Sequence, residues 1–312
     1  MEAPESRSGS DAAQAPAPAS SRSNAIVKTP TWQAMHASRY KRQELIKDIQ
    51  KKTDATLLCY VAGQAAEISR DDVLGFVDLL HNVKRESPVD LMLHTPGGDI
   101  DAAEKLINMV RNVVGPAKLR VVVPDYAKSA GTLMALGADA IVMSDSSELG
   151  PIDPQITLTD GQGNRTSYPV QSYLDSYKEH SEALRQNPSD EVARIMLDKF
   201  EPARIKLFEA ACERARAFAD AQLARGMFRY PNVGPYTEIA KQLLSTARWR
   251  SHGQMIGFAE AQDLKLKIEY VDPRTEPWTS FMQLYCYQRL EIKERQKLFE
   301  SDYVCLTFDQ PS

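Results

Sequence analysis

Short apolar runs alternate with helical periodicity between about residues 55 and 144. Four runs predict strands: ATLLCYVAG (55–63), VDLMLHT (89–95), LRVVVP (119–124) and AIVMS (140–144). The segments between them predict helices over about 69–82, 99–114 and 129–137. Near-continuous apolar strands that alternate with helices are typical of a parallel sheet covered on both faces. The pattern therefore predicts an α/β fold built from βαβ units.

The flanking regions have other patterns. Residues 1–30 are rich in Ala, Pro and Ser without apolar periodicity, which predicts a disordered tail. A helical stripe over about 36–52 follows, and the chain from about 170 to 245 is almost wholly helical in pattern. We therefore expect a core over 31–158 that is interrupted by a helical insertion over 159–250.

Residues 251–312 are expected to close the core. Their pattern predicts a strand at 266–271, a helix over about 280–300 and a final strand at 303–308.

Composition narrows the function classes. A net charge of -4 gives no broad basic surface, so we expect no nucleic-acid partner. The four cysteines are far apart and form no C-x-x-C pair, which indicates neither a zinc site nor a disulfide framework and favours a cytoplasmic location. No window approaches the roughly 18 apolar residues of a membrane span, and the first residues lack a signal-peptide pattern. No pattern indicates a metal or other cofactor.

Two turns carry candidate chemistry, each where an apolar strand meets a helix. The first is His94-Thr95-Pro96-Gly97-Gly98-Asp99, and the second contains Ala127-Lys128-Ser129-Ala130-Gly131. Paired glycines let backbone N–H groups approach a ligand closely, and small neighbours leave a serine hydroxyl accessible. Acyl transfer needs such a hydroxyl together with donors for the oxyanion. The alternative is that the glycines form only a turn and that Ser129 is only a helix cap.

These segments resemble a known family. LMLHTPGGDIDAAEKL (91–106) and VVVPDYAKSAGTLMALGADAIVMSDSSELGPIDPQ (121–155) are similar to the serine dehydrogenase proteinase family, a branch of the Clp protease/crotonase superfold related to signal peptide peptidase A. The resemblance is dense over about 55–158 and returns near 259–271. It implies that Ser129 is the nucleophile, and that Gly97 or Gly98 together with Ala130 donates to the oxyanion. It also implies a homo-oligomer.

The general base is an open question at this stage. Relatives use either a histidine and aspartate, as in Clp subunits, or a lysine, as in signal peptide peptidases. The segment ELGPIDPQ (148–155) has no histidine where a Clp subunit would carry one, so a Clp-type triad is not expected. Lys178 is the nearest match to the peptidase lysine, and His252 is the second candidate; the alternatives are a solvated helix lysine and a packing histidine.

Two further residues near these positions have structural interpretations. Asp153, between two prolines, is expected to fix its loop rather than to orient a base. Lys128 is expected to be solvated or to lie at the rim of the cleft.

The favoured hypothesis is a serine peptidase that hydrolyses protein or peptide substrates through a Ser129 acyl-enzyme. One alternative is a non-catalytic Clp-like scaffold, whose helical insertion would bind a partner. A crotonase-like acyl-CoA enzyme is the other alternative, and a serine in place of an acidic pair at the cleft speaks against it. In the peptidase too, the insertion is a possible docking site for a protein regulator.

Overall fold

The computed structural model describes residues 28–159, 162–163, 165–229 and 236–310, so the predicted tail of residues 1–30 lies almost wholly outside the described residues. The chain divides into two compact units, residues 1–37 and 38–312. The described part of the first unit holds α1 (Pro30–Met35), whose N-terminus is capped by the Thr29 side chain. The second unit holds the sheet and the residues of the candidate site.

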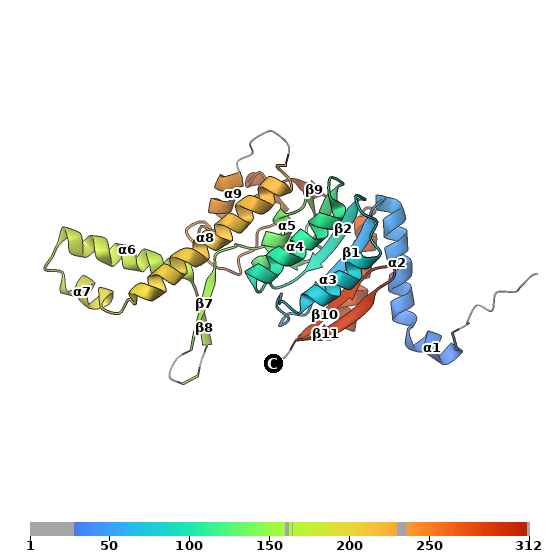
Figure 1. The fold of residues 1–312 in the computed structure, drawn as a ribbon, viewed down its shortest axis with the longest axis horizontal. Helices are drawn as coiled ribbons and strands as arrows, with labels where there is room; N and C mark the ends of the chain where they lie inside the picture. Colours follow the sequence, from blue (N-terminus) through green and yellow to red (C-terminus); the bar gives the residue numbers. More distant parts are fainter. Residues whose placement is uncertain (1–27, 160–161, 164, 230–235, 311–312) are drawn as a thin grey trace, which may run out of the picture. The chain divides into compact units, whose positions relative to one another are not determined.

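A seven-stranded sheet forms the centre of the second unit (Figure 1). Its strands lie in the order β11-β10-β1-β2-β3-β5-β9. Their bounds are β1 (Thr56–Ala62), β2 (Val89–His94), β3 (Leu119–Val122), β5 (Ala140–Met143), β9 (Ile268–Tyr270), β10 (Gln296–Glu300) and β11 (Cys305–Asp309). All neighbours from β1 to β9 pair in parallel, whereas β10 and β11 add an antiparallel edge. The predicted α/β fold with a mostly parallel sheet is confirmed.

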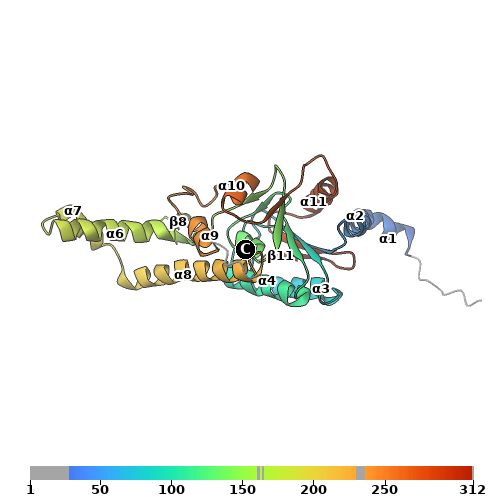
Figure 2. The same cartoon turned by 90° about the horizontal axis from the view of Figure 1, so that it is seen from above.

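Helices cover both faces of this sheet (Figure 2). On one face lie α3 (Asp72–His81), α4 (Ile100–Val114) and the fully buried α5 (Ala130–Leu136); on the other lie α2 (Ala37–Thr53) and α11 (Trp278–Glu291). Side chains of β1 alternate between the two cores, with Leu58 and Tyr60 on the first face and Leu57 and Cys59 on the second. This double coverage explains why β1, β2, β3 and β5 are mostly apolar. Asp90 of β2 and Arg120 of β3 are exceptions, and they pair with each other at 2.6 Å.

The closing part differs from the sequence prediction. The expected helix over 280–300 ends at Glu291, and residues 296–300 form β10, antiparallel to β1. Polar residues of β10 are buried because distant partners satisfy them: Lys297 donates to Asp72, and Glu300 accepts from Arg42 at 2.9 Å. Such long-range ion pairs leave no local periodicity that would distinguish a strand from a helix.

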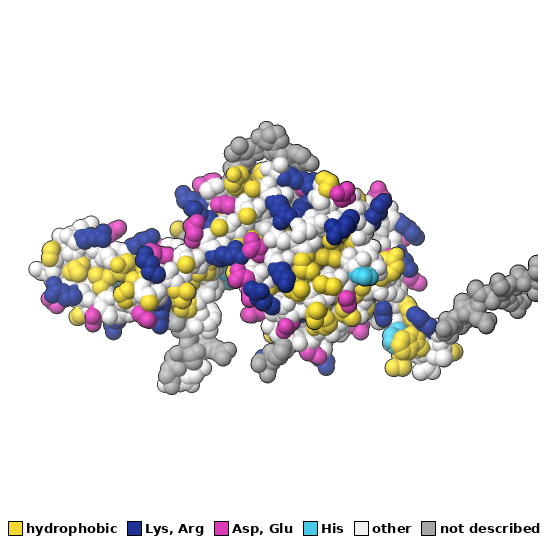
Figure 3. Space-filling model, viewed as in Figure 1, with side chains coloured by type: hydrophobic (Ala, Val, Ile, Leu, Met, Phe, Trp, Pro, Cys, Tyr) yellow, Lys and Arg dark blue, Asp and Glu magenta, His cyan; other side chains and the backbone are white. Residues whose placement is uncertain are grey.

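The insertion forms a hairpin followed by helices. The strands β7 (Gln155–Thr159) and β8 (Arg165–Pro169) pair antiparallel and were not expected from the helical pattern. The helices are α6 (Val170–Gln186), α7 (Glu191–Leu197), α8 (Pro202–Arg225) and α9 (Tyr236–Leu243). α6, α7 and the first part of α8 project from the sheet as an arm with its own apolar core, and apolar side chains are visible on the arm's surface in Figure 3.

Within the described ranges, no helix is both long enough and apolar enough to cross a bilayer.

Candidate active site

The two turns singled out in the sequence lie side by side where β2 and β3 end. The N–H of Thr95 donates to the carbonyl of Tyr126, and the N–H of Lys128 donates to the carbonyl of Thr95, both at 3.1 Å. The short strand β4 (Tyr126–Ala127) also pairs in parallel with β6 (Glu148–Leu149). The glycine turn and the serine turn are therefore joined by backbone hydrogen bonds at the carboxyl end of the sheet, as expected for ligand sites in parallel α/β folds.

Ser129 has an unusual backbone conformation. Its φ of 52° and ψ of -118° lie where few residues with a side chain are found, and it directly precedes α5. Such a conformation costs on the order of 1–3 kcal/mol and persists only where its surroundings enforce it. The Ser129 side chain makes no capping hydrogen bond to α5. The alternative that this serine serves only as a helix cap therefore loses its physical basis.

The glycine turn packs directly against Ser129. A Cβ atom at Gly97, which has a φ of 109°, would lie 2.8 Å from the Cβ of Ser129 and 2.9 Å from the carbonyl oxygen of Lys128. Only glycine fits this approach. The Gly97 N–H donates to Thr95 Oγ1 at 3.2 Å, whereas Gly98 lines the adjoining cavity. Of the two glycines, Gly98 therefore borders the cavity, beside Ala130.

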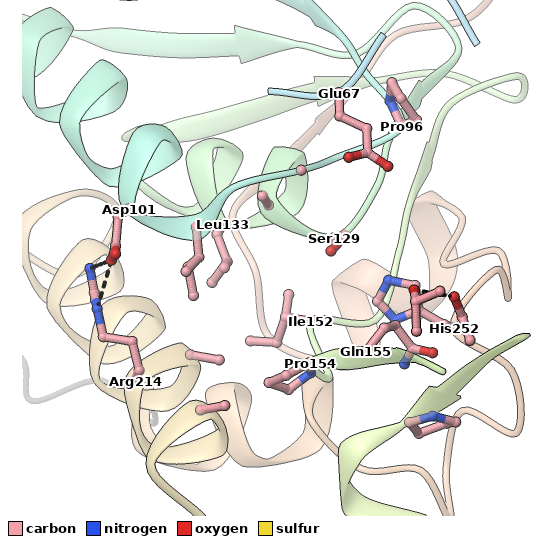
Figure 4. Close-up of a pocket in the computed structure, with 18 of the residues that line it drawn as sticks. Glu67, Pro96, Asp101, Ser129, Leu133, Ile152, Pro154, Gln155, Arg214 and His252 are labelled. Carbon is pink, nitrogen blue, oxygen red and sulfur yellow. Dashed lines mark hydrogen bonds and ion pairs between the residues drawn. The ribbon is translucent and has the colours of Figure 1, made fainter. Parts of the chain in front are cut away.

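A cavity of about 990 Å³ opens at these turns (Figure 4). Ser129, Gly98, Ala130 and His252 all line it, and Ser129 and His252 face it from different parts of the chain. The remaining wall combines apolar residues, among them Ile100, Leu133 and Ile152, with polar ones, among them Glu67, Gln155 and Arg250. At one edge, Arg214 of α8 forms ion pairs with Asp101 and Glu104 of α4 and thereby ties α8 to α4.

His252 is paired with a buried carboxylate. Its Nδ1 lies 2.8 Å from Oδ1 of Asp153, whose side chain is only 5% exposed. The second oxygen of Asp153 accepts from Gln155 Nε2 at 2.6 Å. A carboxylate at Nδ1 favours the tautomer whose proton is on Nδ1, which leaves Nε2 able to accept a proton. Asp153 does not merely fix its loop, as the sequence suggested: it also holds His252.

Lys178 lies elsewhere. It is an exposed residue of α6 and lines a separate cavity of about 460 Å³ together with Cys212 and Lys241. A lysine base must be desolvated to be neutral near pH 7, and the surroundings of Lys178 do not desolvate it. Of the two bases expected from the sequence, the structure brings only His252 into the cavity that contains Ser129.

His94, at the start of the glycine turn, is packed in the protein interior. Its ring is fully buried between the rings of Tyr126 and Tyr285. Burial, assisted by the positive charge of Arg289, lowers the pKa of His94 to about 3. His94 is therefore neutral near pH 7 and forms no ion pair with Asp125, although Nδ1 and Oδ2 are 3.8 Å apart.

This burial predicts a pH dependence of stability. Below about pH 6.5 the unfolded chain binds a proton at His94 that the folded chain does not, so stability falls from there toward pH 3. At about pH 4.5 the free energy of unfolding should have lost roughly 2–3 kcal/mol through this residue, at about 1.4 kcal/mol per pH unit. Urea unfolding of the wild type and of His94→Phe, each at about pH 6.5 and about pH 4.5, measures this loss of unfolding free energy. An equal loss in both proteins would contradict the assignment.

A family model of ClpP-like SDH-type serine proteinases matches residues 25–203, more than half of the chain. The chain belongs to this family, and at the family level it is a serine peptidase with a Clp-like α/β fold. Two uncharacterized proteins of Methanocaldococcus jannaschii are similar in sequence. One is 26% identical over 254 residues, covering 78% of each chain. The other is 28% identical over 244 residues, covering 75% of this chain and 73% of the relative.

Two solved structures are similar to this chain at low sequence identity. An alanine variant of the membrane-bound stomatin-specific protease 1510-N has 16% sequence identity and a TM-score of 0.41, over 70% of this chain and 81% of that chain. ClpP1 from Listeria monocytogenes has 14% identity and a TM-score of 0.37, over 72% of this chain and 96% of that chain.

Proposed function

We propose that this chain hydrolyses peptide bonds through an acyl-enzyme on Ser129, with His252 as the general base and Asp153 as the residue that orients it. The observation that carries this proposal is that His252, which lines the same cavity as Ser129, has its Nδ1 2.8 Å from Oδ1 of the buried Asp153. Membership of a serine proteinase family supports it. Lys178, the other base considered, has no role in this mechanism.

The proposed reaction has two halves. Ser129 Oγ attacks the peptide carbonyl carbon and passes its proton to His252 Nε2, while the N–H groups of Gly98 and Ala130 stabilise the oxyanion. The tetrahedral intermediate then collapses, and the departing amine takes the proton from His252. Water attacks the acyl-enzyme, gives a proton to His252 and releases the acid, and Ser129 recovers its proton. Asp153 stabilises the imidazolium through its contact with Nδ1 of His252.

Fluorophosphonate labelling tests this proposal. A serine that has a base and an oxyanion hole reacts with the probe at phosphorus, so we expect a single stoichiometric adduct. Mass spectrometry of the digested protein should locate it on the peptide that contains Ser129. An unlabelled protein, or an adduct on another serine, would contradict the mechanism and favour the scaffold alternative.

Assembly, location and regulation are the further parts of the proposal. A homo-oligomer, a cytoplasmic location and a regulator that binds the helical insertion belong to the proposal. The exposed apolar side chains Val192, Ile195 and Leu207 on the arm are compatible with a docking role.

A further inference from the structure

Lys128, the residue before Ser129, has its ammonium group surrounded by oxygen atoms. Its Nζ donates to Glu148 Oε2 at 2.7 Å and to the Leu149 carbonyl at 3.2 Å. It also lies 3.5 Å from the carbonyl of Gly253 and 3.4 Å from that of Gln254. The side chain is only 15% exposed, which contradicts the solvated alternative of the sequence prediction; a place at the rim of the cleft stays a prediction. We propose that Lys128 is a positioning residue, which holds the loop that carries His252 against the Ser129 turn. The inference rests on the proposed function.

The path of the Lys128 side chain is shaped by a glycine. A Cβ atom at Gly150 would lie 2.8 Å from Lys128 Cδ, so a larger residue at position 150 would obstruct the Lys128 side chain. Because Glu148, Leu149 and Gly150 are consecutive, one short segment supplies the carboxylate, a carbonyl and the open space. This arrangement directs the ammonium group toward the distant loop that contains Gly253 and Gln254.

The two carbonyls that Lys128 reaches directly follow His252 in the chain. Beyond them, Ile256 forms a two-bond bridge with Leu149, and before them Trp249 donates its indole N–H to the carbonyl of Gln242. These contacts fix the two ends of the loop. Lys128 contacts its middle, and its backbone is continuous with that of Ser129. The separation of base and nucleophile therefore depends on Lys128 as well as on the contact of His252 with Asp153, and rates are sensitive to such placement.

Lys128 is poorly arranged to be the base itself. A base must give up a proton before it can accept one, and the protons of this ammonium group are directed at a carboxylate and at carbonyls. Its effect on the reaction is therefore expected to pass through His252. A double-mutant cycle separates an effect through His252 from an independent one.

The experiment measures kcat, KM and the rate of fluorophosphonate labelling for Lys128→Met, His252→Ala and the double variant. Methionine keeps the apolar stem beside Gly150 and removes the ammonium group. We expect Lys128→Met to lower kcat and the labelling rate about 10–100-fold with KM little changed, as for a displaced catalytic group. In the His252→Ala background, the same substitution should change the labelling rate less than about twofold, because the coupled effect is already lost.

Lys118→Met is the matched control, because Lys118 also pairs with a glutamate at 2.7 Å but lies away from the cavity. It should leave kcat unchanged. If the unpaired Glu148 lowers the melting temperature of Lys128→Met, the Lys128→Met/Glu148→Gln variant removes that charge and should show the same loss of kcat.

Three results would overturn the positioning role. They are an undiminished effect of Lys128→Met in the His252→Ala background, an unchanged kcat in both Lys128→Met variants, and full activity of His252→Ala. Failure of the proposed function itself is recognised separately, because Ser129→Ala would then retain activity.

Discussion

Ser129→Ala is expected to abolish peptide hydrolysis and fluorophosphonate labelling while leaving the fold intact. Loss of the nucleophile in a serine peptidase lowers kcat by about 10⁶-fold. The fold should survive, because the Ser129 hydroxyl makes no capping hydrogen bond to α5 and alanine keeps the same Cβ atom. Peptidase assays with a quenched fluorescent peptide library, together with thermal melts, measure both effects.

Ser129→Gly is the matched control for the strained backbone. With its φ of 52°, residue 129 occupies a region that glycine enters without steric cost, so this variant should be inactive and at least as stable as Ser129→Ala. Residual hydrolysis by both variants at rates near the wild type would assign the reaction to another residue.

The helices and strands around these turns were predictable because the local hydrophobic pattern of each one matches its structure. The strands β2 and β3 are mostly apolar runs whose charged residues, Asp90 and Arg120, pair with each other, and α4 has an amphipathic pattern that ends at Gly115. The hairpin β7–β8 and the strand β10 were missed for a different reason. β10 pairs with β1 across most of the chain, and its buried charges are balanced only by Arg42 and Asp72.

The site divides in the same way. Ser129 and the glycine turn could be predicted from the sequence because each is a local motif at the end of a strand. Asp153 and His252 are 99 residues apart, and neither has a local motif that indicates the other. The order of Asp153 and His252 in the chain also makes the pair hard to predict. The carboxylate of Asp153 lies in the segment 148–155, where a Clp subunit would carry its histidine.

The role of Lys128, the residue next to Ser129, could not be predicted from the sequence either. Its position next to the nucleophile is plain in the sequence, but the direction of its side chain depends on Glu148 and on the open space at Gly150. Adjacent residues at a helix start point in different directions, so adjacency alone cannot assign a role.

His252→Ala is expected to lower kcat by about 10⁴–10⁶-fold, close to the effect of removing the nucleophile, since neither residue acts without the other. Asp153→Asn should lower it by about 10³–10⁴-fold, because the amide keeps the geometry but favours the wrong tautomer of His252. Lys178→Ala should keep kcat within about twofold of the wild type, as an exposed substitution remote from the cavity. Initial rates on one cleaved peptide, with labelling rates in parallel, measure all three.

The three variants together separate the possible bases. If Lys178 were the base, Lys178→Ala would lose the activity and His252→Ala would retain it, and the pairing of His252 with Asp153 would then be structural. A purely structural pair would also predict that both of its variants lower the melting temperature while the remaining folded protein keeps the kcat of the wild type. The catalytic assignment predicts the opposite: folded protein with little activity. Because the His252 side chain is partly exposed at the cavity wall, its removal leaves no large buried void, and the two outcomes can be distinguished in the same preparation.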